Sequence, residues 1–217
     1  MIIAFDLDDT LVDWWAGISA AAAAVATGPA ITRLMDEVRA TAWVRVDGLV
    51  VNREHWQLLL NPAPYWRVAL PGATEDEIAE TITRFHAALH VPPFPEVDAA
   101  LEALGRSHAL AIISNNPAAD HALRQAGLRH HFAEVVSLWD DQRKPAPFGF
   151  NELCERMSAG PADVVYVGDS PTHDVIGASS FGMGAVWLDR YDDPWTPPAG
   201  CPRITTLDQL IGVLSPG

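Results

Sequence analysis

Short apolar runs rich in β-branched residues recur along the chain and alternate with helical patterns. The runs are Ile2–Phe5, Ala109–Ile113, Glu134–Val136, Val164–Val167 and Ala185–Leu188. Between the later runs, apolar residues repeat at the spacing of an amphipathic helix. Buried strands that alternate with helices are typical of a parallel sheet with helices on both faces. We therefore predict an α/β fold built on a doubly wound parallel sheet.

The alternation is interrupted between the first two runs, where residues 14–90 have an almost wholly helical pattern. Thr74 followed by Glu77 is a capping-box signature, and Asn52 is placed to cap a short helix. The segment Val91–Pro95 is rich in proline, which is typical of a semi-rigid hinge. We expect an α/β core with an inserted helical cap subdomain. The predicted boundaries are 1–13 and 91–217 for the core, and 14–90 for the cap.

Composition and charge exclude several classes of protein. The chain has 217 residues, with 28 acidic against 14 basic groups and a net charge of −14, which argues against binding to nucleic acid or anionic membrane. The longest nearly apolar stretch, Trp14–Ala26, is shorter than the roughly 18 residues that span a bilayer. Cys154 and Cys201 form neither a disulfide framework nor a metal-binding pair. Because no secretory leader is evident either, we expect a cytoplasmic protein.

Polar side chains follow four of the predicted strands, at the point where each strand ends or soon after it. Because the carboxyl ends of parallel strands meet at one edge of a sheet, we expect these side chains to converge on one ligand site. The candidate residues are Asp6, Asp8, Thr10, Ser114, Asn115, Lys144, Asp169 and Asp174.

The carboxylates in this set need a cation to offset the repulsion between their charges. Asp6, Asp8 and Asp169 within a few ångströms would repel one another by about 4 kcal/mol per pair at an effective dielectric constant of ~20. Mg²⁺ removes that penalty and prefers carboxylate, water and phosphate oxygens. Lys144 is the only lysine beside 13 arginines, and its compact ammonium suits a phosphate and a neighbouring carboxylate better than a forked guanidinium. The set indicates phosphoryl transfer with Mg²⁺ as cofactor.

These residues resemble the four motifs of the haloacid dehalogenase (HAD) superfamily, in the same order and over nearly the whole chain. The matches are Asp6, Asp8 and Thr10 for Asp-x-Asp-x-Thr, Ser114 for the second motif, Lys144-Pro145 for the third, and Gly168-Asp169 with Asp174 for the fourth. The insertion after the first motif is similar to the cap of one subgroup. That subgroup contains phosphoglycolate phosphatase, small-sugar phosphatases, nucleotidases and haloacid dehalogenases.

The resemblance implies a Mg²⁺-dependent phosphomonoesterase that acts on a small phosphorylated metabolite. It implies that Asp6 attacks phosphorus to form an aspartyl-phosphate, and that Asp8 acts as general acid and then as general base, with Lys144 as the third catalytic group. The implied metal ligands are Asp6, Asp169 and the backbone carbonyl of Asp8. Asp174 is implied either to bind the metal directly or to hold the residues that bind it. The groups implied to orient the phosphoryl group are Thr10, Ser114, Asn115 and Lys144.

Two other functions stay open beside this one. A 2-haloacid dehalogenase uses the same nucleophile to displace halide, but that chemistry needs neither Mg²⁺ nor a protonated leaving oxygen, so Asp8 and Asp169 argue against it. A non-catalytic phosphate-binding HAD-like protein would not need candidates for every catalytic role. Asp174 also fits the description of an acid at a helix N-terminus, and Asp9 that of a capping residue. The sequence identifies neither the substrate nor the oligomeric state.

Tryptophan is concentrated in the insertion or at its start. The five residues are Trp14, Trp15, Trp43, Trp56 and Trp66, and Arg45, Arg53, His55 and Arg67 are interspersed among them. This pattern fits either core packing of a small helical subdomain or a lining that faces a substrate.

Overall fold

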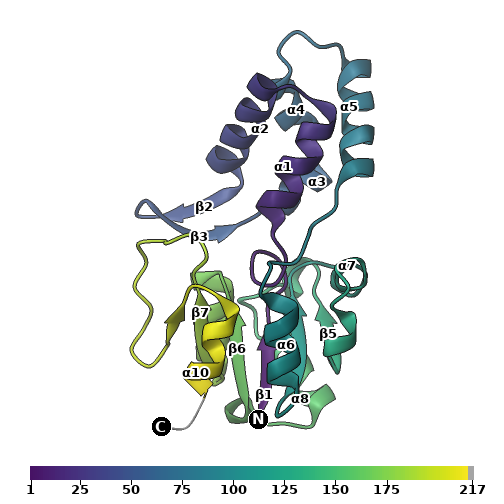
Figure 1. Cartoon of the computed structure of the whole chain (residues 1–217). Helices are drawn as coiled ribbons and strands as arrows, with labels where there is room; N and C mark the ends of the chain where they lie inside the picture. Colours follow the sequence, from purple (N-terminus) through teal and green to yellow (C-terminus); the bar gives the residue numbers. More distant parts are fainter. Residues whose placement is uncertain (215–217) are drawn as a thin grey trace. The chain divides into compact units, whose positions relative to one another are not determined.

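A computed structural model describes residues 1–214 and divides the chain into two compact units, drawn in Figure 1. We call them the core, formed by Met1–Asp13 and Pro93–Gly217, and the cap, formed by Trp14–Pro92. The chain returns to the core two residues later than the expected boundary after residue 90.

The core contains a six-stranded parallel sheet with the order β5-β4-β1-β6-β7-β8. The strands are β1 (Ile2–Phe5), β4 (Ala109–Ser114), β5 (Glu134–Ser137), β6 (Val164–Gly168), β7 (Gly184–Leu188) and β8 (Arg203–Ile204). The predicted doubly wound sheet and its five strands are confirmed. β8 was not predicted, because a strand of two residues has no measurable periodicity.

The strand order places β1 at the centre of the sheet, between β4 and β6. The chain first adds β4 and β5 on one side of β1 and then crosses to the other side to form β6. Ligands of open α/β sheets bind beyond the carboxyl ends of the strands at such a reversal of strand order. The loops that follow β1, β4 and β6 are therefore the expected place for a site.

The helices of the core cover both faces of this sheet. They are α6 (Val97–Gly105), α7 (Ala119–Gln125), α8 (Phe148–Met157), α9 (Gly177–Phe181) and α10 (Leu210–Leu214). Single turns occur at Arg129–His131, Asp140–Gln142, Pro161–Asp163 and Leu207–Gln209, and a π-helix spans Pro171–Ile176. In Figure 1, α6 lies in front of β1.

Helix α8 packs on the opposite face through Phe150 and Leu153, which join Ala4 and Ile113 of the sheet in one buried cluster. Burial of each large apolar side chain contributes about 1.5–3 kcal/mol. The approach is close because Gly149 has no side chain: a Cβ there would lie 2.8 Å from Ile113 Cγ2.

The cap is mainly helical but also contains a β-hairpin, so the prediction of an almost wholly helical insertion was wrong in this part. Its helices are α1 (Trp14–Val25), α2 (Gly28–Thr41), α3 (Trp56–Leu60), α4 (Ala63–Ala69) and α5 (Glu75–Ala88), and the hairpin strands are β2 (Trp43–Val46) and β3 (Leu49–Arg53). Asn52 lies in β3 and caps no helix. Asp47 and Gly48 form the turn with φ of 50° and 84°, and Asp-Gly flanked by hydrophobic residues is a strong hairpin signal.

Other features of the cap agree with its sequence. Thr74 and Glu77 form the expected capping box at the start of α5, with Thr74 N–H donating to Glu77 Oε2 at 2.7 Å. Trp66 is fully buried and meets Phe85 edge to face at 5.4 Å, so this tryptophan packs the interior of the cap. Trp15 instead lies beneath a guanidinium, that of Arg39 at 4.3 Å.

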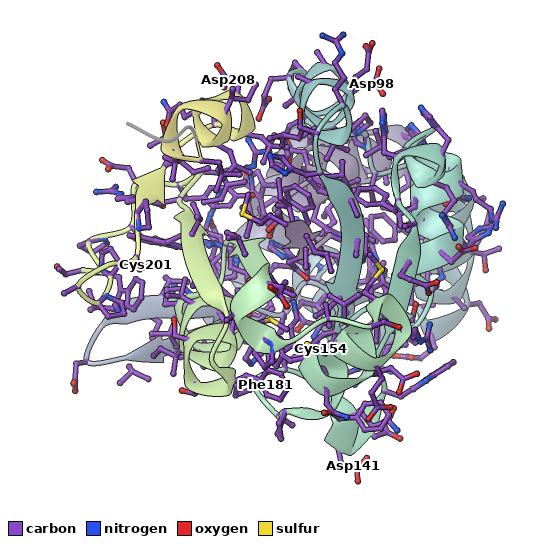
Figure 2. All side chains as sticks on the ribbon, turned by 90° about the horizontal axis from the view of Figure 1, so that it is seen from below. Asp98, Asp141, Cys154, Phe181, Cys201 and Asp208 are labelled. Atoms are coloured by element: carbon purple, nitrogen blue, oxygen red, sulfur yellow. The ribbon has the colours of Figure 1, made fainter. Side chains whose placement is uncertain are left out.

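The surface of the core accounts for much of the negative charge. Asp98, Asp141 and Asp208 are exposed, and Figure 2 shows them at the periphery of the molecule. The same view separates Cys154, within α8, from Cys201, in the loop before β8, and both are free thiols. Among the described residues, no helix has the length and apolar character needed to cross a membrane.

Candidate active site

Lys144 is the centre of the polar network at the carboxyl edge of the sheet. Lys144 is 3% exposed, and its ammonium donates three hydrogen bonds of 2.7 Å each, to Asp6 Oδ1, Asp174 Oδ1 and the Tyr166 hydroxyl. An ammonium has three protons, so these contacts use all of its donors. Tyr166 in turn donates to the Ile113 carbonyl at 2.8 Å. The lone lysine is therefore held rigidly between two carboxylates.

The charges of this network shift the pKa values of its members. Burial alone would lower the pKa of Lys144, but Asp174 and Asp6 outweigh it and raise the pKa above its usual range. Burial raises the pKa of Asp6 to about 8; Lys144 opposes this increase, and Asp174 and Asp8 add to it. A cation bound beside Asp6 would favour its ionised form. Tyr166 stays protonated, because burial and the neighbouring carboxylates raise its pKa well above the ordinary value.

The loop after β1 carries three of the predicted residues and is tied to the loop after β6. The backbone N–H of Asp6 continues the sheet by donating to Val167 O at 2.9 Å. Thr10 is fully buried, and its hydroxyl accepts a hydrogen bond of 3.1 Å from the backbone N–H of Asp169. Asp8 is half-buried, and its Oδ1 accepts a bond of 3.4 Å from Asn116 Nδ2. The first and fourth motifs thus support each other directly.

The end of β4 supplies Ser114 and Asn115. Ser114 is 1% exposed, and its Oγ accepts a hydrogen bond of 3.1 Å from Asn116 N–H. The side chain of Asn115 brackets the backbone of Lys144, accepting from Lys144 N–H at 2.7 Å and donating to Lys144 O at 3.2 Å. The Asn115 side chain therefore positions Lys144, while the expected contact of Asn115 with the phosphoryl group stays a prediction. His173 Nδ1 lies 3.3 Å from Asn115 Nδ2.

Asp174 lies in the π-helix that begins after β6 and is 1% exposed. One carboxylate oxygen accepts from Lys144, and the other accepts from the Ser170 backbone N–H at 2.9 Å. Asp174 is thus both an acid at a helix start and a partner of the lysine. Its carboxyl group lies directly over Gly168, where a Cβ would come within 2.3 Å of Asp174 Cγ. Only glycine fits at this position without a shift of the carboxylate.

Three carboxylates are arranged in a way that fits a hard divalent cation. Oxygen atoms of Asp6, Asp169 and Asp174 all lie within 4.8 Å of one another, and all three residues are buried. A donor set made of oxygen alone suits Mg²⁺ or Ca²⁺ better than metals that prefer nitrogen or sulfur. The Asp8 side chain is not part of this group, so only its backbone carbonyl, as expected from the resemblance, remains a candidate ligand.

Hydrogen bonds join the eight predicted residues in three groups within the core. Lys144 holds Asp6, Asn115 and Asp174, Asn116 bridges Asp8 and Ser114, and Thr10 is bonded to Asp169. Sequence reasoning missed other members of these groups, chiefly Tyr166 and Asn116. A buried tyrosine in a strand of valines needs a partner for its hydroxyl, and that requirement was the available signal for Tyr166. Asn116 offered no comparable signal.

Comparison with known proteins places this site in a family. Residues 1–182 match the family model of the haloacid dehalogenase-like hydrolases. The chain belongs to this family. It is accordingly an enzyme with hydrolase activity, and the residues predicted from sequence lie at the carboxyl edge of its sheet. The comparison with curated proteins gives no match.

Solved structures with the same fold include both phosphatases and dehalogenases. The hydrolase is similar to a 2-haloacid dehalogenase from Pseudomonas syringae pv. Tomato DC3000, with 28% identity, a TM-score of 0.62, and coverage of 98% of this chain and 97% of that one. A predicted phosphoglycolate phosphatase from Haemophilus somnus has 22% identity, a TM-score of 0.65, and coverage of 99% and 97%. The HAD-hydrolase YfnB from Bacillus subtilis, bound to magnesium, has 21% identity, a TM-score of 0.70, and coverage of 99% and 98%.

Proposed function

We propose that this hydrolase is a phosphomonoesterase that acts on a small phosphorylated metabolite through an aspartyl-phosphate on Asp6. The observation that carries the proposal is the joint placement of Asp6, Asp169, Asp174 and Lys144 at the carboxyl edge of the sheet, with Asp8 two residues beyond Asp6. This arrangement brings a nucleophile, a cation site and the positive charge of Lys144 together at one place, where a phosphate group could be attacked.

In the first half-reaction, an Asp6 oxygen forms a bond to phosphorus while the bond from phosphorus to the leaving alcohol oxygen breaks. Asp8 donates a proton to that oxygen. In the second half-reaction, water attacks phosphorus, Asp8 takes a proton from the water, and the bond between phosphorus and Asp6 breaks to release phosphate. Lys144 fixes the Asp6 carboxylate through Oδ1, which leaves attack to the other oxygen.

The ligands of a Mg²⁺ ion would be the carboxylates of Asp6 and Asp169 and the backbone carbonyl of Asp8. Asp174 is better suited to orient Lys144, because both of its oxygens already accept hydrogen bonds from the chain. When bound, Mg²⁺ supplies charge that neutralises the phosphate oxygens and the carboxylates around them. Thr10, Ser114 and the Asn115 backbone are proposed to orient the phosphoryl group.

The dehalogenase alternative is supported by the 28% identity to a 2-haloacid dehalogenase. Displacement of halide by Asp6 would use neither the proton of Asp8 nor a cation held by Asp169. Because Asp169 is buried beside two other carboxylates, its negative charge would destabilise the folded site if no cation were bound there. We therefore favour the phosphatase.

The deciding experiment measures phosphate release from an aryl phosphate, and chloride release from a short 2-chloroalkanoate, with Mg²⁺ and with EDTA. We expect Mg²⁺-dependent phosphate release and no chloride release. Asp6→Asn should abolish turnover, whereas Asp208→Asn, an exposed aspartate of the same core, should retain it. Turnover of the chloroalkanoate in EDTA, or an active Asp6→Asn variant, would rule the proposal out.

A further inference from the structure

Two consecutive residues after β7, Arg190 and Tyr191, hold the loop that carries Asp6 and Asp8. Arg190 Nε and Nη2 both donate to the carbonyl oxygen of Thr10, at 3.0 and 2.6 Å. The Tyr191 hydroxyl donates to Asp9 Oδ1 at 2.9 Å. The site described above does not use either residue.

The contacts of Arg190 require the planar, forked shape of a guanidinium. Its side chain is 6% exposed, its Nη1 donates to Glu96 Oε1 at 2.8 Å, and its Cζ lies 3.6 Å from the centroid of the Phe94 ring. A planar fork can bond Thr10 and Glu96 and stack on a ring at the same time, whereas a lysine ammonium cannot.

The loop needs support of this kind because its backbone is strained. Asp9 adopts φ of 59°, a left-handed conformation that costs a non-glycine residue about 1–2 kcal/mol. The turn is closed by Asp9 N–H to Val12 O at 2.9 Å and by Leu11 N–H to Leu7 O at 2.8 Å. Tyr191 bonds the side chain of the strained Asp9, and Arg190 bonds the carbonyl oxygen of the next residue, Thr10.

Arg190 also fixes the core side of both connections to the cap. The chain leaves the core after Asp13 and returns at Pro93. Phe94, the ring beneath Arg190, donates its N–H to Leu11 O at 3.1 Å, and Val12 bridges to Pro93. One guanidinium thus contacts Thr10 before the first connection and Phe94 after the second.

We propose that Arg190 and Tyr191 are positioning residues of the reaction, which keep Asp8 and Thr10 aligned with Asp6 and Asp169. They act through the backbone of the loop and contact no reacting atom. Errors of about 1 Å in such alignment can reduce turnover by about 100-fold. The kinetic part of this inference rests on the proposed phosphatase function.

The kinetic test compares Arg190→Lys and Tyr191→Phe with Arg203→Lys. Arg203 is the control, because it lies in β8 beside β7, pairs with the buried Asp189 and has its Cζ 5.2 Å from the Trp187 ring, but none of its contacts within residues 1–214 is with the loop. We expect kcat to fall about 10- to 100-fold in Arg190→Lys and less in Tyr191→Phe, with KM within about 3-fold. Guanidinium at millimolar concentration should partly restore kcat in Arg190→Ala.

Hydrogen exchange of the loop amides provides a readout that does not depend on activity. In Arg190→Ala, the amides of Asp9, Leu11 and Val12 should exchange at least about 10-fold faster, while the rest of the sheet and the Arg203→Ala control keep their wild-type rates. Unchanged exchange and unchanged kcat in the Arg190 variants would overturn the proposal. Faster exchange throughout the core would also overturn it, because Arg190 would then stabilise the fold in general. A wild type inactive on every phosphate ester would refute the phosphatase and leave the exchange test standing.

Discussion

At the scale of single residues, the candidate site is organised around donors and acceptors that are fully used. The Lys144 ammonium has three partners, and Tyr166 both accepts from it and donates to the Ile113 carbonyl. The predicted residues could be found from sequence because each follows a strand of a parallel sheet. Tyr166 lies inside β6 and Arg190 matches none of the four motifs, and their partners Lys144 and Thr10 lie 22 and 180 positions away, so both were missed.

Removal of the Tyr166 hydroxyl should remove one hydrogen bond of Lys144 without leaving a cavity in the core. Tyr166→Phe leaves the buried ammonium with two partners and the Ile113 carbonyl with one fewer, so we expect a loss of about 1–3 kcal/mol in unfolding free energy. Urea denaturation measures this, and kcat should fall with it. Tyr65→Phe, a buried tyrosine of α4 in the cap, is the control. Equal stability of the Tyr166 and Tyr65 variants would show that the hydrogen bonds to Lys144 contribute nothing.

At the scale of elements, the sequence predicted the strands of the core better than the structure of the cap. Apolar runs bounded by turn residues identified five of the six strands of the core sheet, but the helical interpretation of residues 14–90 overrode the Asp47-Gly48 signal of a hairpin. β8 has two residues, too few for a periodic pattern, and the structure identifies it by its pairing with β7. Local patterns thus located most elements, whereas β8 had no local signal and the signal of the hairpin was outweighed by the helical pattern around it.

The junction between β6 and the π-helix depends on the absence of a side chain at Gly168. In Gly168→Ala, the new Cβ would lie 2.3 Å from Asp174 Cγ, so the carboxylate must move away from Lys144. We expect a cost of about 1–3 kcal/mol in stability and at least a 100-fold loss of kcat, comparable to a large misalignment. Gly105→Ala at the end of α6, where a Cβ would have an ordinary contact of 3.7 Å, is the matched control. Wild-type kcat in Gly168→Ala would contradict the tight placement of Asp174.

At the scale of the whole molecule, Glu96 joins three segments of the core that are distant in sequence. It lies at the start of α6, accepts from Arg190 Nη1 at 2.8 Å, and accepts from Leu207 N–H at 3.3 Å near the last helix. Burial alone would raise the pKa of Glu96, but its own backbone N–H, Arg190 and Leu207 lower the pKa below its usual range. The ionised form is therefore the one that the folded state prefers.

The stability contributed by Glu96 should depend on pH in a definite direction. Because the pKa is lower in the folded state, the stabilisation is complete above the unfolded pKa of about 4.3 and is lost as the pH falls through the folded pKa. Glu96→Gln should reduce the unfolding free energy by about 1–3 kcal/mol at pH 7, and this difference should shrink below pH 4. Thermal unfolding from pH 7 to pH 3 measures it, with Glu102→Gln on the exposed face of α6 as control. A difference that stays constant with pH would refute the ionic contribution.

The burial of the chain's only lysine has a consequence for chemical labelling. Reagents that acylate amines need a neutral, accessible nitrogen, and Lys144 is charged, 3% exposed and fully hydrogen-bonded. In the folded hydrolase, its side chain is therefore protected from acylation. Once the site opens, the same residue becomes the single acylable lysine of the chain. The mass added at Lys144 over time thus records how often the carboxyl edge of the sheet opens.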